Sequence, residues 1–488
     1  MNPKDIPQET ELLDYQLTRR RFLTRTSANL GVAAVASLMN PGPIAATNPK
    51  SSQASGIGLL GRPHHQAKAK RVIYLFQSGG PSHIDLFDPK PRLNKEHGKD
   101  LPPSIKGTQR VTLMTRNQKR FPCFGTPFKF KQHGRAGHWF SNIVPHMASV
   151  ADELCFIKGL HTEPINHDPA MTFMQTGRGV PGLPSIGSWL NYGLGSENEN
   201  LPAYVVMTSG VTQQPVLSRY YHSGFLPSKY QGVQFQSTGD PVLFLSNPTG
   251  MSHQNRGLTI SAINRLNKIK QDSVGDPEIQ ARIDSYEMAY QMQVSVPELT
   301  DMSKEPKHIL DMYGPDVKKE GTFAYQCLLA RRMAERGVRF VQLFHAGWDQ
   351  HGNLKKDIQR QTRASDQPSA ALIKDLKMRG MLDDTLVIWG GEFGRTAYTQ
   401  GSNGRDHHPR CFTVWMAGGG IKGGISYGST DDYGYNLADE STAIHVNDFH
   451  ATVLHCLGID HARLTYRFGG RDFRLTDVAG KVVNPLLA

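Results

Sequence analysis

The sequence predicts an α/β protein whose mostly parallel central sheet carries helices on both faces. Short, continuous apolar runs recur along the chain, as in strands that are buried on both faces. These runs lie at residues 71–76, 154–157, 203–207, 338–344, 385–389 and 412–416. Helical periodicity appears between them, for example at 185–190 and 369–381. Strands that alternate with helices in this way favour a right-handed parallel sheet.

The length and composition predict one large domain with an insertion. The chain has 488 residues, of which 38% are hydrophobic and 20% charged, and this balance indicates a packed globular body. We expect the domain to span residues 71–488. Between about 210 and 320 the pattern changes to polar amphipathic helices at 261–269 and 277–294. Two interpretations stay open for this insertion, a lid over a site and an excursion that packs on the surface.

The N-terminus resembles a twin-arginine export signal. The segment Thr18-Arg19-Arg20-Arg21-Phe22-Leu23 precedes a weakly apolar run at 28–39 and a plausible cleavage region at 41–46. We therefore expect a signal at 1–46, a linker at 47–70, and transport by the twin-arginine machinery to the periplasm or another exported location. No other run approaches the roughly 20 apolar residues of a membrane span, so no stable span is expected.

Charge and cysteine content narrow the possible partners. The formal net charge is +12, which favours acidic substrates or polyanions. Nucleic acid is not expected, because no stripe of lysine and arginine with interleaved aromatic residues is present. The five cysteines are widely spaced and odd in number, and they form neither a disulfide framework nor a cysteine metal motif.

A loop after the 338–344 run concentrates possible metal ligands. His345, Asp349 and His351 lie within seven residues, and backbone turns can bring an imidazole and a carboxylate onto one ion. The alternative is that Asp349 caps a turn while His351 lies in solvent. Mixed histidine and carboxylate ligation suits zinc or manganese better than calcium.

Four segments together resemble a known bacterial family. They are Ser78-Gly79-Gly80-Pro81-Ser82-His83-Ile84-Asp85, Thr176-Gly177-Arg178, Trp348-Asp349-Gln350-His351 and Gly391-Glu392-Phe393-Gly394-Arg395-Thr396. The resemblance is to the family of domain of unknown function 1501 (DUF1501), a sulfatase-like branch of the alkaline phosphatase superfamily. It covers the chain from about Arg71 to the C-terminus. It implies an alkaline phosphatase-like three-layer sandwich, a metal site and hydrolysis of sulfate or phosphate esters.

The resemblance also suggests individual site residues. Sulfatases have a nucleophilic cysteine or serine nine positions before the threonine of Thr-Gly-Arg, and this chain has His167 there. That imidazole suggests a metal ligand, and its presence removes the formylglycine route. Glu392 takes the place of an aspartate ligand, while Phe393 replaces the ligand that follows it. His407 matches a zinc ligand of phosphatases, with His408 as the near alternative, and Asp85, with or without His83, is the candidate ligand near the first strand.

The expected function is hydrolysis of an anionic small-molecule or polysaccharide ester by a metal-activated water. Arg178 and Arg395 would neutralise the ester. Two alternatives stay open: His167 itself attacks phosphorus or sulfur, or the protein is a non-catalytic binder of sulfated or phosphorylated polysaccharide. The residues expected to hold one or two divalent ions are Asp85, His167, Asp349, His351, Glu392 and His407.

Overall fold

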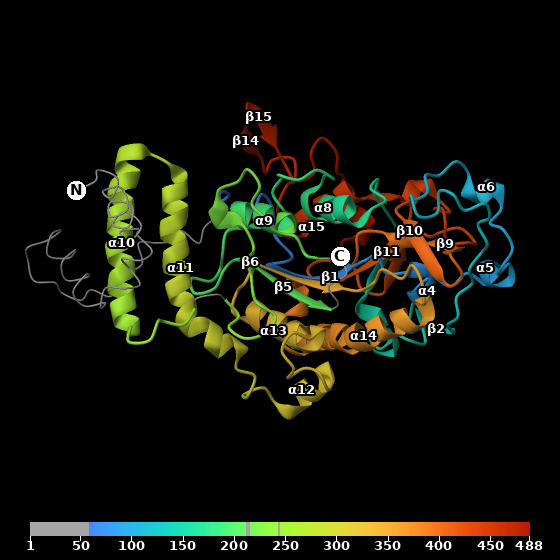
Figure 1. Ribbon diagram of the computed structural model, residues 1–488, viewed down its shortest axis with the longest axis horizontal. Coiled ribbons are helices and arrows are strands. Elements are labelled where there is room, and N and C mark those ends of the chain that lie inside the picture. The colour runs from blue at the N-terminus through green and yellow to red at the C-terminus, as the bar shows by residue number, and fades with distance from the viewer. Residues whose placement is uncertain (1–57, 211–214, 243–244) are drawn as a thin grey trace, which may run out of the picture. The chain divides into compact units, whose positions relative to one another are not determined.

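The computed structural model describes residues 58–210, 215–242 and 245–488, and its architecture confirms the predicted fold class. Within these residues a nine-stranded sheet has the order β12-β4-β11-β8-β1-β7-β5-β6, with β13 beside β4 (Figure 1). The strands are β1 (Arg71–Ser78), β4 (Cys155–His161), β5 (Tyr204–Gly210), β6 (Val233–Gln234), β7 (Phe340–Ala346), β8 (Thr385–Gly390), β11 (Phe412–Ala417), β12 (Ile425–Tyr427) and β13 (Ile444–His445).

Each of the predicted apolar runs forms a strand of this sheet, and β1 lies between β7 and β8 in parallel register. Phe76 of β1 is opposite Phe344 on one side and Gly390 on the other. Strand β11 is antiparallel to both of its neighbours. The connection between β8 and β11 explains this direction. It consists of the antiparallel hairpin of β9 (Gly394–Gln400) and β10 (Gly404–His408), which brings the chain back to the edge of the sheet where β8 ends, so β11 begins there.

Helices cover both faces of the sheet (Figure 1). One face packs against α8 (His167–Thr176), α9 (Ile186–Leu194) and α15 (Val446–Cys456), and the apolar core includes Tyr74, Phe76, Trp189 and Phe449 on this side. The other face packs against α13 (Phe323–Glu335), which contacts β1, β5 and β7. Helix α13 also packs against α14 (Leu354–Met378) and α12 (Lys307–Tyr313). Loops follow the carboxyl ends of the parallel strands, and in such sheets this edge is where ligands bind.

Smaller elements complete the main unit. The short helices are α4 (His83–Leu86), α5 (Pro91–Lys95), α6 (Pro103–Lys106) and α7 (Pro145–Ala148). Besides β9–β10, two antiparallel pairs stand apart from the central sheet: β2 (Phe130–His133) with β3 (His138–Ser141), and β14 (Tyr466–Phe468) with β15 (Arg471–Phe473).

Residues 244–294 belong to a second compact unit, and its described part contains α10 (His253–Val274) and most of α11 (Pro277–Thr300). The Ser252 hydroxyl accepts a hydrogen bond from the Asn255 amide at the start of α10, and Gly275 ends that helix with φ 72°. Among the described helices, none combines the length and apolar character needed to cross a bilayer. The export signal predicted at 1–46, and the linker as far as residue 57, lie outside the described residues.

Candidate metal centre

Four side chains from distant parts of the sequence converge at the carboxyl edge of the sheet. His167 is the first residue of α8, Asp349 and His351 lie in the loop after β7, and His407 lies on β10. One ligand atom from each lies within 4.8 Å of those from the other three. The side chains of Asp349 and His351, which share one loop, therefore face the same point.

The Oδ1 atom of Asp349 is the point on which three imidazoles converge. Its distances to the Nε2 atoms are 3.1 Å for His167, 2.8 Å for His351 and 3.4 Å for His407. The Nε2 atoms of His167 and His407 are buried and have no aligned hydrogen-bond partner among the described residues. Nitrogen lone pairs that face a common point without hydrogen bonding fit an ion at that point.

The opposite nitrogen of each imidazole, Nδ1, has an oxygen partner. A carboxylate, an amide oxygen and a backbone carbonyl can only accept from a ring N–H, so each pairing keeps the proton on Nδ1 and leaves Nε2 as a donor to metal. Histidines that bind metals are held in this way. The pairs are His167 with Glu392 Oε1 at 2.6 Å, His407 with the Ile165 carbonyl at 2.7 Å, and His351 with Gln400 Oε1.

The charge states also suit metal binding. Burial opposes ionisation of Asp349, but the three neighbouring histidines and the charge of Arg395 hold its pKa well below the usual carboxyl range. Burial lowers the pKa of His407 to about 4, so this ring is neutral at pH 7. Burial would also lower the pKa of His167, but Asp349 and Glu392 outweigh it and raise that pKa. Metal binding at Nε2 of His167 therefore competes with protonation of that atom.

The donor set of three imidazoles and one carboxylate fits zinc or manganese, which accept mixed nitrogen and oxygen ligands. Magnesium and calcium favour oxygen ligands alone. Within the described segments, this is the one group of three or more histidine, cysteine, aspartate or glutamate side chains that lie close enough together to hold a metal ion.

Two predicted ligands lie elsewhere. The Glu392 carboxylate accepts from His167 Nδ1 and from the Gly79 amide, and so it lies behind the histidine and orients it. The Asp85 carboxylate forms a fully buried ion pair with Arg405 at 2.8 Å and is not one of the four converging side chains. Asp85 follows the end of β1 by several residues and therefore lies in α4.

The two arginines expected at the ester occupy structural positions. Arg178 follows the far end of α8 and pairs with Asp477 at 2.7 Å, and a ten-residue helix places it about 15 Å from His167. Arg395 is fully buried, where its guanidinium donates to the carbonyls of Gly79 and Gly80 and to Asp349 at 2.6 Å. Arg395 is therefore closed off from solvent, whereas Arg178, whose side chain is 43% exposed, lies at the opposite end of α8 from His167.

The Thr-Gly-Arg sequence also has a structural reason. Gly177 ends α8 in the left-handed region with φ 76°, and a Cβ there would lie 2.0 Å from the Leu475 carbonyl oxygen. The Thr176 hydroxyl donates to the Thr172 carbonyl. This motif therefore ends the helix that positions His167, and it takes no direct part in the site.

Replacing Glu392 tests its orienting role. Glu392→Ala is expected to weaken metal binding by about 10- to 100-fold, the usual effect of losing an outer partner of a metal-bound histidine. Glu392→Gln keeps an acceptor for Nδ1 and should lose less. Titration of each variant with zinc against a competing chelator measures the difference; equal affinity of all three proteins would remove Glu392 from this role.

A glycine close to the site offers a second test. Gly404 lies so close to the backbone of the His351 loop that a Cβ would be 1.8 Å from the His351 carbonyl oxygen, whereas a Cβ on Gly352 meets nothing nearer than 3.7 Å. Gly404→Ala is expected to displace His351 and lower zinc affinity. Gly352→Ala, in the same loop, is the matched control and should bind zinc like the original protein.

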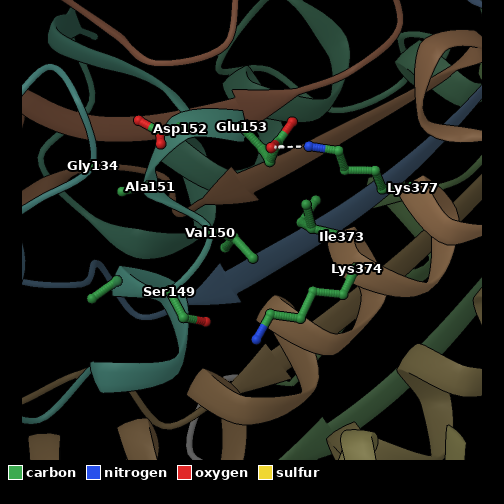
Figure 2. A pocket seen from close by; sticks show the side chains of 10 residues that line it. Gly134, Ser149, Val150, Ala151, Asp152, Glu153, Ile373, Lys374 and Lys377 are labelled. Atoms are coloured by element: carbon green, nitrogen blue, oxygen red, sulfur yellow. Dashed lines mark hydrogen bonds and ion pairs between the residues drawn. The ribbon is translucent and has the colours of Figure 1, made fainter.

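A separate cavity of about 300 Å³ lies away from this group (Figure 2). Its lining includes Glu153, which pairs with Lys377, and also Asp152 and Lys374. Helix α14 begins at Leu354, beside the loop that contains His351. Lys374 lies 20 residues further along this helix, so it is about 30 Å from the helix start. The cavity is therefore not the entrance to the metal group.

The fold and the converging side chains define an α/β protein with a histidine and carboxylate site at the carboxyl edge of its sheet. The chain belongs to the family described as protein of unknown function (DUF1501), whose model matches residues 69–487. No curated protein matches it in sequence.

Solved structures show distant likenesses. The complex of Ps i-CgsB with k-i-k-neocarrahexaose is 11% identical, with 80% of this chain and 72% of that chain covered and a TM-score of 0.35. A protein in the alkaline phosphatase superfamily from Vibrio parahaemolyticus is 11% identical, with 90% and 76% covered and a TM-score of 0.32. The C-terminal periplasmic domain of EcEptC from Escherichia coli, in complex with zinc, is 8% identical, with 81% and 84% covered and a TM-score of 0.33. At TM-scores this low, nothing about activity follows for this chain.

Proposed function

We propose that this protein is a metal-dependent hydrolase of sulfate or phosphate esters. The observation that carries the proposal is the orientation of three imidazoles: each has its Nδ1 paired with an oxygen and its Nε2 turned toward Asp349 Oδ1. A divalent ion held there would polarise an ester oxygen and lower the pKa of a water molecule.

The surrounding residues prepare the ligands. Glu392 holds the proton of His167 at Nδ1, and the three histidines together with Arg395 favour the ionised form of Asp349. Direct attack by His167 on an ester is less well supported, since its Nδ1 is occupied by Glu392 and its Nε2 faces Asp349. The geometry therefore favours His167 as a ligand over His167 as a nucleophile.

The proposed substrate is anionic and the proposed location is outside the cytoplasm. The net charge of +12 attracts acidic substrates. The twin-arginine segment at 18–23 supports export by the twin-arginine machinery. Export of a folded protein would allow the metal to be loaded before transport.

Elemental analysis combined with hydrolysis tests the proposal. The purified protein should contain about one equivalent of zinc or manganese and should hydrolyse an aryl sulfate or aryl phosphate. His351→Ala should lose both properties, whereas His308→Ala, an exposed histidine of α12, should keep them. Metal without hydrolysis of either ester would favour the non-catalytic binding protein, and absence of stoichiometric metal after incubation with zinc and manganese would contradict the proposal.

A further inference from the structure

Four aromatic rings form a continuous surface where the β14–β15 hairpin meets the segment around Phe225. This aromatic surface consists of Phe225, Tyr466, Phe468 and Phe473. Phe225 is stacked on Phe468, with ring centroids 5.1 Å apart and planes inclined by 15°, and on Tyr466 at 5.8 Å and 17°. Phe468 is nonetheless 52% exposed, so one face of the stack is open to solvent.

The inner side of the aromatic surface is fixed to the core. Trp189 of α9 packs edge-on against Phe225, and Tyr192 packs edge-on against Tyr466. Two three-residue strands have little stability by themselves. The ring contacts therefore hold the hairpin in place and present Phe468 as a preformed, flat apolar surface.

Cationic side chains surround the rings. Between Arg463 and Arg474 the sequence has four arginines and a single acidic residue, Asp472. The Arg471 guanidinium lies over the Phe473 ring, 4.7 Å from its centroid, and also pairs with Asp477. The Arg467 side chain pairs with Asp472 at 3.3 Å but stays 70% exposed, so its guanidinium is open to an anion from solvent. Guanidinium groups bind sulfate and phosphate through paired N–H donors.

We propose that the aromatic surface binds an anionic polysaccharide. The C–H faces of a sugar ring pack against a flat aromatic ring, which supplies apolar contact area without requiring a deep pocket. Sulfate or phosphate groups on the same polymer pair with the surrounding arginines. The ligand is thus expected to have both sugar rings and negatively charged groups, and a neutral glycan lacks the latter.

The position of the aromatic surface relates it to the metal centre. The chain after β15 contacts the end of α8, where Asp477 pairs with Arg178 at 2.7 Å and the Leu475 carbonyl lies against Gly177. His167 begins the same ten-residue helix, about 15 Å away. An extended polymer could contact both places, and in this respect the inference rests on the proposed ester hydrolysis.

Affinity electrophoresis in gels that contain dextran sulfate or uncharged dextran tests the inference. Dextran sulfate is expected to retard the protein, and Phe468→Ala and Arg467→Gln should each weaken this binding at least fivefold. Val478→Ala, an 82% exposed apolar residue, and Arg135→Gln, whose side chain is 91% exposed, are the matched controls and should bind like the original protein. Asp349→Asn should also keep full binding, so that loss of catalysis and loss of polysaccharide binding are measured separately.

Other outcomes would overturn the inference. Loss of binding in Arg467→Gln but not in Phe468→Ala would mean that charge alone acts, and equal retardation by uncharged dextran would exclude anion recognition. Sedimentation with phosphatidylglycerol vesicles that depends on Phe468 would assign the surface to a membrane. A dimer that Phe468→Ala dissociates would assign it to a second copy of the chain.

Discussion

Asp349→Asn is expected to abolish metal binding and any metal-dependent hydrolysis. The Oδ1 atom of Asp349 is the shared neighbour of three imidazole Nε2 atoms, and it pairs with Arg395 at 2.6 Å. An amide at this position keeps the shape but removes the negative charge that a divalent ion needs. We expect the zinc affinity to fall by more than about 100-fold, beyond the loss typical of an outer partner.

Asp168→Asn is the matched control for this variant. Asp168 follows His167 directly, but its carboxylate accepts from Arg219 and from the Tyr220 hydroxyl at 2.8 Å. It should therefore bind zinc normally. Circular dichroism of both variants without metal separates a lost ligand from a lost fold. Unchanged zinc content in folded Asp349→Asn would show that the metal lies elsewhere.

Arg405→Met is expected to give the largest loss of stability. The Arg405 guanidinium is fully buried, donates to both oxygens of Asp85 and also bonds the Thr396 carbonyl at 3.0 Å. The substitution leaves the Asp85 carboxylate buried without its partner. Breaking a buried ion pair in this way costs about 3–5 kcal/mol of the free energy of unfolding. Urea denaturation measures the change.

A double-mutant cycle isolates the pair. Arg405→Met combined with Asp85→Leu should recover part of the stability, because the uncompensated charge is gone. Arg405 holds the pKa of Asp85 below its usual value. Since that pKa is depressed in the folded state, the stabilisation is complete above about pH 4 and is lost as the pH falls further. A cost below about 1 kcal/mol would contradict the buried-pair interpretation.

Asp85→Asn distinguishes the ion pair from metal ligation. The sequence placed Asp85 among the ligands, whereas the structure places its carboxylate on Arg405 and Ser82. The variant is expected to be less stable. At temperatures below its unfolding transition, it should retain its full complement of zinc. Loss of zinc from the folded variant would restore Asp85 to the metal site.

The strands of the sheet could be predicted because each is a short apolar run, and the runs at 71–76 and 338–344 are buried on both faces as expected. The antiparallel direction of β11 could not be predicted, because a run of apolar residues does not indicate in which direction the strand runs. The return of the chain through β9 and β10 determines it.

The sequence singled out the four converging residues for reasons that differ between them. Asp349 and His351 share one loop, so their spacing alone suggested a common ion. His167 and His407 required the resemblance to a known family to be selected from the 20 histidines of the chain. Gln400 and the Ile165 carbonyl, which hold His351 and His407, have no sequence signal, because any backbone carbonyl or amide side chain can accept such a hydrogen bond.

The separation of Arg178 from His167 follows from the sequence itself. A helix that begins at His167 and continues to Thr176 separates its two ends by about 15 Å, too far for both to contact one ester group. Glu392 is different: only the folded structure shows that its carboxylate faces Nδ1 of His167 rather than the four converging atoms.

A crystal of zinc-loaded protein, measured on both sides of the zinc absorption edge, tests the metal centre most directly. We expect one anomalous peak about 2.0–2.2 Å from the Nε2 atoms of His167, His351 and His407 and from a carboxylate oxygen of Asp349. Glu392 should remain on Nδ1 of His167, outside the ligand shell. A peak at Asp85 or Glu392, or no peak among the three histidines, would contradict the account.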